Sequence, residues 1–223
     1  MKTLYKFTSV LASVVLAMST AAIPAKADVL VIVLDISSST PIVQPTFMRT
    51  AMPMLADDIA GLPIGSHIKV LTVGDDKASP FTIDIWTQRT ADTRGDTAKA
   101  LASKVPNSIA VYLNALRADP SRMQNESSLS PAFLDASKYC APSKPCKINF
   151  LTDGMEYQPN IVTWPIEYQK PLPPIAGLDL KGATINMYGI GQGVSSPVRI
   201  AVERHWEKWL KAHNAGNVTL RRL

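Results

Sequence analysis

The apolar positions of the chain form short continuous runs that alternate with stretches of helical spacing. Val29–Leu34 is an unbroken run of Val, Ile and Leu, which is typical of a strand buried on both faces. Further strands are predicted at His67–Val73, Phe81–Trp86, Lys147–Leu151, Ala183–Ile190 and Val218–Leu220. Apolar residues recur every three or four positions in the predicted helices, which are Gln44–Leu62, Asp96–Leu116 with a break at Pro106-Asn107, Leu129–Tyr139 and Val198–Ala212.

The lengths of the connections predict how these strands pair. Only Gly74–Pro80 separates the strands His67–Val73 and Phe81–Trp86. A parallel crossover needs a dozen or more residues, so this pair is expected to be antiparallel. The other strands alternate with helices, which favours parallel pairing. We therefore predict an α/β fold with a doubly wound, mostly parallel sheet, one antiparallel edge strand and helices on both faces.

The first 27 residues have the features of a bacterial-type signal peptide. Lys2 and Lys6 precede an apolar stretch, Thr8–Ile23, and Ala25-Lys26-Ala27 places small residues at a cleavage site. An uncleaved membrane anchor is the alternative, but the stretch is diluted by Ser and Thr and is shorter than a spanning helix. We expect cleavage after Ala27, a periplasmic or secreted protein without a membrane span, and one domain over residues 28–223.

The charge of the chain changes once the leader is removed. The full chain has 23 Lys and Arg against 18 Asp and Glu, and three of the Lys lie in the leader. The remaining 20 basic and 18 acidic residues nearly balance. Such a balance gives no reason to expect nucleic acid or an anionic membrane surface as a partner.

The chain has two cysteines, Cys140 and Cys146, separated by five residues. In an exported protein a local disulfide is the favoured interpretation. A metal-binding cysteine pair is less favoured, because no further Cys and no suitably placed His completes such a site. The bridge would join the end of one helix to the start of the strand before Asp153.

Two polar motifs follow directly after buried strands. Asp35-Ile36-Ser37-Ser38-Ser39 follows Val29–Leu34, and Thr152-Asp153-Gly154 follows Ile148–Leu151. In an open α/β sheet, ligands bind at the carboxyl ends of the strands. Carboxylates and hydroxyls without Cys or His are the ligand set of a hard cation such as Mg²⁺. Taken singly, the first motif could be a helix N-cap cluster and the second an ordinary turn, but together they predict a metal site.

In this order the two motifs resemble the von Willebrand factor type A domain, over essentially all of residues 28–223. The resemblance implies a doubly wound sheet with a metal-ion-dependent adhesion site at one edge, occupied by Mg²⁺ or Mn²⁺. The hydroxyls of Ser37 and Ser39 would contact the ion directly. Asp35 and Asp153 would act largely through bound waters.

The family usually supplies a threonine from a third loop, in a pattern such as Gly-Thr-x-Leu-x-x-Ala-Leu. The corresponding segment here begins Glu126-Ser127-Ser128-Leu129, and its register places Ser127 at the threonine position. Ser128 remains an alternative for this role. The predicted metal ligands are Asp35, Ser37, Ser39, Ser127 and Asp153.

Neutral hydroxyl ligands leave much of the charge of the ion uncompensated, so it would bind one further anionic oxygen. An acidic residue of a partner protein can supply that oxygen, which predicts a metal-dependent binding module with no catalytic residue. The segment Met155–Leu178 has five prolines and follows Asp153, so Tyr157 and Trp164 could form a contact surface beside the metal.

Two other functions are kept as alternatives. The first is a metal-independent scaffold subunit of an envelope secretion or conjugation machine. The second is a Mg²⁺-dependent phosphohydrolase, since Asp35 ends a strand, as the nucleophile of haloacid dehalogenase-like enzymes does. Those enzymes carry Asp-x-Asp, however, and here the second position is Ser37.

Overall fold

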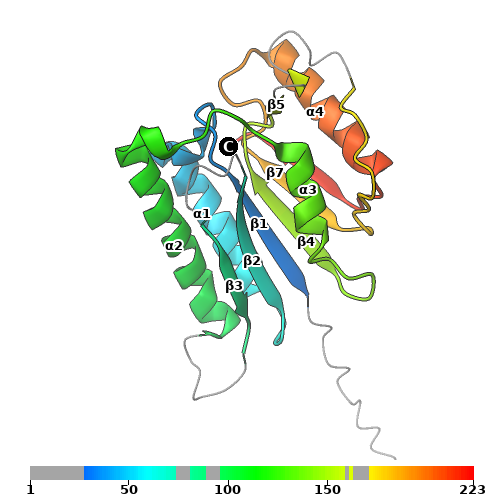
Figure 1. Ribbon diagram of the computed structural model, residues 1–223. Helices are drawn as coiled ribbons and strands as arrows, with labels where there is room; N and C mark the ends of the chain where they lie inside the picture. Colours follow the sequence, from blue (N-terminus) through cyan, green and yellow to red (C-terminus); the bar gives the residue numbers. More distant parts are fainter. Residues whose placement is uncertain (1–27, 74–80, 89–95, 159–160, 163–170) are drawn as a thin grey trace, which may run out of the picture.

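The computed structural model describes residues 28–73, 81–88, 96–158, 161–162 and 171–223. The predicted leader, residues 1–27, lies outside this part. A six-stranded sheet with the order β3-β2-β1-β4-β7-β8 forms the centre of the molecule (Figure 1). Its strands are β1 Val29–Asp35, β2 His67–Val73, β3 Ile83–Trp86, β4 Cys146–Leu151, β7 Thr184–Tyr188 and β8 Val218–Arg221.

The pairing of the strands confirms the predicted topology. β1 pairs in parallel with β2 and β4, and β7 pairs in parallel with β4 and β8. β3 is antiparallel to β2 at one edge of the sheet. The carboxyl ends of the five parallel strands therefore share one end of the sheet, at the top of Figure 1.

Two helical layers cover the sheet. α1 Pro45–Ala60 and α2 Ala98–Ala118 pack on one face, and α3 Leu129–Ser137 and α4 Ser196–Ala212 pack on the other. In β1, Leu30, Ile32 and Leu34 belong to the core under α1 and α2, while the alternate residues belong to the core under α3 and α4. Every residue of β1 is buried, which explains its unbroken apolar run.

The break predicted at Pro106-Asn107 is wrong, because α2 is a continuous helix of 21 residues that includes Pro106. A proline inside a helix removes one backbone hydrogen bond. Here residues on both sides of it, Val105 and Ile109, are buried in the core that α2 shares with α1. This burial offsets the local cost, since most helical stability in proteins comes from packing an apolar face.

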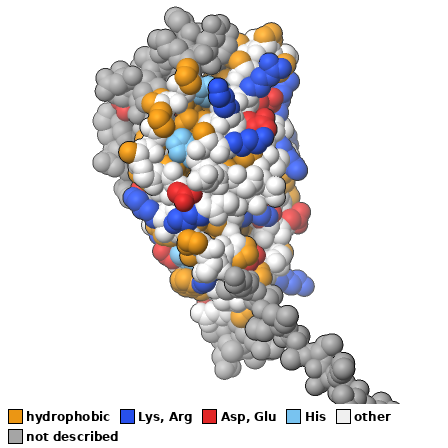
Figure 2. All heavy atoms as spheres, turned by 90° about the vertical axis from the view of Figure 1, so that its right-hand side faces the viewer, with side chains coloured by type: hydrophobic (Ala, Val, Ile, Leu, Met, Phe, Trp, Pro, Cys, Tyr) orange, Lys and Arg blue, Asp and Glu red, His pale blue; other side chains and the backbone are white. Residues whose placement is uncertain are grey.

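Two rings of α4 and the ring of its C-cap residue, His213, contact the segment 171–175. The Nε2 atom of His205 accepts the backbone N–H of Leu172 at 2.9 Å, and the Nε2 atom of His213 accepts that of Ile175 at 3.3 Å. Between them Trp209 donates its indole N–H to the carbonyl of Pro173 at 3.0 Å. Figure 2 faces this side of the molecule, where histidine and hydrophobic side chains lie together.

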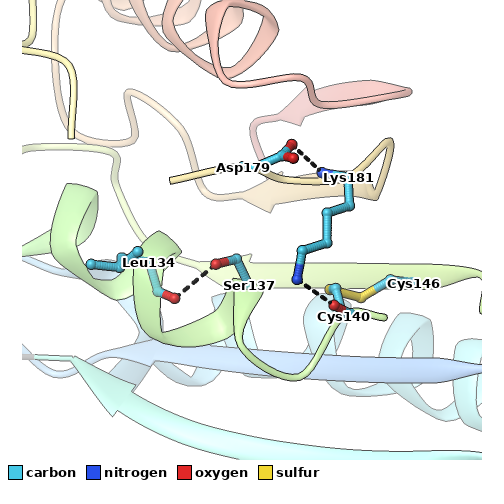
Figure 3. Close-up of a disulfide and its surroundings, with 6 residues drawn as sticks. All are labelled: Leu134, Ser137, Cys140, Cys146, Asp179 and Lys181. Atoms are coloured by element: carbon cyan, nitrogen blue, oxygen red, sulfur yellow. Dashed lines mark hydrogen bonds between the residues drawn. A yellow bond between two sulfur atoms is a disulfide. The ribbon is translucent and has the colours of Figure 1, made fainter. Parts of the chain in front are cut away.

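The predicted disulfide is confirmed: Cys140 and Cys146 are bonded, with their Cα atoms 5.5 Å apart (Figure 3). Cys140 lies three residues beyond the end of α3, and Cys146 is the first residue of β4. The ammonium group of Lys181 donates to the carbonyl of Cys140 at 2.8 Å. The bridge and this hydrogen bond tie α3, β4 and the turn before β7 together.

The proline-containing segment Met155–Leu178 includes a short antiparallel pair, β5 Tyr157–Gln158 and β6 Ile161–Val162. Trp164, proposed as part of a contact surface, lies outside the described residues. No helix in the described part of the chain combines the length and apolar character that crossing a membrane requires.

Candidate metal centre

Three loops meet at the carboxyl end of the sheet. The first follows β1, the second precedes α3 and the third follows β4. An isolated parallel bridge between Ser37 and Gln124 joins the first two loops. The backbone N–H of Ser38 donates to the carbonyl of Gln124 at 2.7 Å, and the N–H of Gln124 donates to the carbonyl of Ile36 at 3.1 Å. Backbone hydrogen bonds therefore fix the first loop to the second.

Asp35 lies at the centre of the candidate site, fully buried. Its Oδ1 atom accepts the backbone N–H of Ser37 at 3.0 Å. Its Oδ2 atom accepts the hydroxyls of Thr152 at 2.7 Å and Ser127 at 3.1 Å. One carboxylate thus contacts all three loops, and its side chain is held by donors on both oxygens.

Asp153 is the second carboxylate, and it is 2% exposed. Its Oδ1 atom accepts the backbone N–H of Met155 at 2.8 Å, and its carbonyl accepts the N–H of Gly191 at 2.8 Å. Burial, and then the charge of Asp35, raise the pKa of Asp153 to about 7. Burial also raises the pKa of Asp35. Two neighbouring carboxylates therefore favour a positive charge between them.

The candidate hydroxyl ligands lie beside these carboxylates. The Oγ atoms of Ser37 and Ser39 are 3.3 Å apart; Ser37 is buried, and Ser39 is exposed. The hydroxyl of Ser39 lowers the pKa of the Asp153 carboxyl, against the effect of burial. These groups open into a pocket of about 370 Å³, lined by Ser37, Ser38, Ser39, Asn125, Ser127, Asp153, Met155, Gln192, Gly193 and Val194.

The donor set fits a hard divalent cation. The groups that lower the pKa of Asp35 and Asp153 are hydroxyls and backbone amides, and no Lys or Arg among the described residues forms an ion pair with either carboxylate. In the described ranges no group of three or more His, Cys, Asp or Glu side chains could hold a metal by itself. A cation at this pocket would therefore depend on serine hydroxyls together with two carboxylates, a set of oxygen ligands typical of Mg²⁺ sites.

Four of the five predicted ligand residues, Ser37, Ser39, Ser127 and Asp153, line this pocket, and the fully buried Asp35 lies behind them, hydrogen-bonded to Ser37 and Ser127. The structure also separates the two serines that were alternatives in the third loop. Ser127 is buried and bonds to Asp35, whereas Ser128 lies at the N-cap of α3 without a side-chain capping bond. Ser127 is therefore the residue of that loop whose hydroxyl faces the other candidate ligands.

Sequence reasoning gave no role to two further residues. Thr152 was noticed only as part of its motif, yet its hydroxyl both donates to Asp35 and accepts the N–H of Gly154 at 2.9 Å. Glu156 is 2% exposed and accepts the backbone N–H and the hydroxyl of Ser130, at 2.8 and 2.9 Å. An acidic residue near Asp153 was visible in the sequence, but its partner 26 residues away was not.

No protein-family model and no curated protein matches the chain. Among solved structures, an aerotolerance-related membrane protein from Bacteroides fragilis is 15% identical, with a TM-score of 0.46 over 87% of this chain and 90% of that one. A von Willebrand factor type A protein from Catenulispora acidiphila is 18% identical, with a TM-score of 0.48 over 89% of this chain and 39% of that one. The pilus adhesin SpaC of Lactobacillus rhamnosus GG is 10% identical, with a TM-score of 0.49 over 88% and 28%.

The fold is von Willebrand factor type A-like. It has the order β3-β2-β1-β4-β7-β8 with one antiparallel edge strand, and helices cover both faces. The Asp35 motif and the Asp153 motif end the adjacent central strands β1 and β4, so they meet at one end of the sheet. The comparisons concern the fold only, and the chain spans 39% and 28% of the second and third proteins named above.

Proposed function

We propose that residues 28–223 form a binding module that captures an acidic residue of a partner protein through a bound Mg²⁺ or Mn²⁺. The ion would be held by Asp35, Ser37, Ser39, Ser127 and Asp153. One observation carries the proposal: hydroxyls and carboxylates from three loops gather at one pocket, and the hydrogen-bond partners of both carboxylates are neutral.

Buried and exposed residues of the site would have different roles in binding such an ion. Asp35 has no exposed surface and is hydrogen-bonded to Ser37, Ser127 and Thr152. It would therefore orient the ligand hydroxyls and the waters bound to the ion, and it would not contact a partner protein. Ser39 is exposed and faces the pocket. When bound, the ion supplies an electrophilic position for one further anionic oxygen.

The walls of the pocket suit a side chain that reaches inward. Met155 and Val194 provide apolar surface, while Asn125 and Gln192 provide amide groups. A carboxylate entering this pocket would find hydrogen-bond donors beside the ion and apolar contacts for its methylene groups. These neighbours support a partner that offers Asp or Glu from a protein surface.

The geometry at Asp35 disfavours the phosphohydrolase alternative. A nucleophilic carboxylate needs an oxygen free to attack phosphorus. Both oxygens of Asp35 accept hydrogen bonds, and the residue is fully buried. The metal-independent scaffold remains the competing function, and it predicts that the protein acts without a bound metal ion.

Export remains part of the proposal, with cleavage after Ala27 and a periplasmic or secreted location. The disulfide between Cys140 and Cys146 supports it, because such bonds persist in oxidising compartments.

Calorimetric titration of the purified exported protein with Mg²⁺ and Mn²⁺ tests the proposed function. We expect one ion to bind, and Asp35→Ala to abolish binding with little change in the circular dichroism spectrum. Ser103→Ala is the control, since Ser103 is an exposed serine of α2 that does not line the pocket. A parent protein that binds neither metal would favour the scaffold.

A further inference from the structure

Glu156 links two of the loops that form the candidate site. It lies three residues after Asp153, and its partner Ser130 lies three residues after Ser127. Oε2 of Glu156 accepts the backbone N–H of Ser130 at 2.8 Å, and Oε1 accepts its hydroxyl at 2.9 Å. Both residues are 2% exposed, so this two-point contact is shielded from water.

The end of this link that carries Glu156 is rigidly held. The N–H of Gly154 donates to the Thr152 hydroxyl at 2.9 Å, and the carbonyl of Gly154 accepts the indole N–H of Trp206 at 2.8 Å. Met155 donates to Asp153 at 2.8 Å. The turn between Asp153 and Glu156 is therefore fixed by side chains and by α4, and Glu156 extends from a defined position.

The other end is the first turn of α3. Ser130 is the second residue of this helix, where backbone N–H groups lack intrahelical partners. A carboxylate there satisfies one such donor and interacts favourably with the helix dipole. Because α3 begins two residues after Ser127, the position of its first turn fixes where the Ser127 hydroxyl lies.

We propose that Glu156 is a positioning residue of the metal site: by holding Ser130, it sets the distance between the Ser127 hydroxyl and the Asp153 turn. This role rests on the proposed function. Glu156 does not line the pocket, and its two hydrogen bonds to Ser130 connect it to α3. Residues that orient metal ligands in this way typically change metal affinity by 10–100-fold when they are replaced.

The test compares two substitutions by calorimetric titration with Mn²⁺. Glu156→Ala removes the two hydrogen bonds to Ser130, and we expect affinity to fall about tenfold or more. Glu156→Gln keeps the shape, because its amide oxygen can accept the Ser130 N–H while its amide nitrogen donates to the Ser130 hydroxyl. We expect this variant to restore most of the affinity. If Glu156→Gln binds as weakly as Glu156→Ala, the charge acts on the ion directly and the positioning role is wrong.

A double-mutant cycle identifies Ser127 as the residue acted upon. The loss caused by Glu156→Ala should largely disappear when Ser127 is already alanine, since no hydroxyl is left to position. Additive losses would overturn the link to Ser127. Asp58→Ala is the matched control for general destabilisation: Asp58 also joins a helix to β4, through Lys147 and Asn149, but near the opposite end of the sheet. It should lower thermal stability without changing metal affinity.

Two results separate this inference from the proposed function. A parent protein that binds Mn²⁺ while Glu156→Ala binds it equally well leaves the metal site standing and overturns the role of Glu156. A parent protein that binds no metal overturns both. If Glu156→Ala does not fold, Ser130→Ala tests the positioning role instead, because it removes the hydrogen bond from the Ser130 hydroxyl to Glu156. Parent-like Mn²⁺ affinity in that variant contradicts the proposal.

Discussion

Of the three hydrogen bonds to the Asp35 carboxylate, the one donated by the Thr152 hydroxyl is the shortest, at 2.7 Å. We predict that Thr152→Val, which keeps the side-chain shape, leaves the buried Oδ2 atom short of one donor. A hydrogen bond to a charged group contributes about 1.5–3 kcal/mol, so the free energy of unfolding should fall by roughly that amount. Metal affinity should fall as well, because Asp35 loses a restraint on its orientation.

Urea unfolding and calorimetric titration measure these two effects. Thr219→Val is a suitable control, because Thr219 lies in β8, away from the three loops. A Thr152→Val variant with the stability and affinity of the parent protein would show that this hydroxyl has no role.

Gly154 adopts a backbone conformation that other residues avoid, with φ of 78°, and an added Cβ would lie 2.5 Å from Cδ1 of Ile190. We predict that Gly154→Ala destabilises the fold by about 3 kcal/mol, from backbone strain together with overpacking. Gly177 has a similar φ of 80° but open space around its Cβ position. Gly177→Ala should therefore lose only about 1 kcal/mol. Equal losses in urea unfolding would contradict the steric part of this account.

At the scale of elements, one hydrogen bond between α4 and the segment 171–175 requires a neutral His205. The Nε2 atom of His205 accepts a backbone N–H, which a protonated ring cannot do. Burial, and to a smaller extent Lys208, lower the pKa of His205 below its ordinary 6.5. The unfolded chain therefore takes up the proton more readily, so this contribution to stability is present above pH 6.5 and is lost as pH falls through the folded-state pKa.

We predict that His205→Gln reduces this pH dependence, because glutamine can accept the same N–H without titrating. The measurement is the free energy of unfolding in urea at pH 7.5 and at pH 5.5, and the informative quantity is how the difference between parent and variant changes with pH. A difference that is the same at both values would mean that His205 does not contribute to the pH dependence.

The bond between Cys140 and Cys146 closes a short loop between α3 and β4. In the chain-entropy model a loop of this size stabilises the fold by about 2 kcal/mol. We predict that reduction lowers the urea midpoint accordingly, and that Cys140→Ser with Cys146→Ser reproduces the loss. A thiol assay on unreduced, denatured protein is the direct check, since two titratable thiols would contradict the bond.

The elements differ in how far the sequence determined them. The apolar run of β1 and the short link between β2 and β3 gave correct strands and correct pairing, because both signals are local. The break predicted at Pro106 of α2 was wrong, because the packing that offsets the proline comes from α1, which is distant in the sequence. At the candidate site, register against the family pattern favoured Ser127 and left Ser128 open. Glu156 was missed because its partner becomes visible only when α3 and the Asp153 turn are brought together.

At the scale of the whole molecule, the two ligand motifs lie on adjacent central strands, and the pocket opens at the end of the sheet. We predict that a captured partner dissociates when EDTA is added and binds again when Mg²⁺ is restored. The immobilised Asp35→Ala variant should retain none of it, whereas Ser103→Ala, outside the pocket, should behave like the parent. Replacing one surface Asp or Glu of the partner should abolish capture. A partner that EDTA does not release would favour the scaffold function.

The burial of β1 on both faces also has a consequence for how the chain is made. β1 emerges early in synthesis, but Val29 pairs with Cys146 of β4, so one neighbour of β1 arrives only after 117 further residues. At roughly 5–20 residues per second, this partner is synthesised about 6–23 s after β1. During that interval its apolar residues are exposed and prone to aggregation. A chaperone that binds short apolar segments would therefore be expected to bind near residues 29–35 in nascent chains.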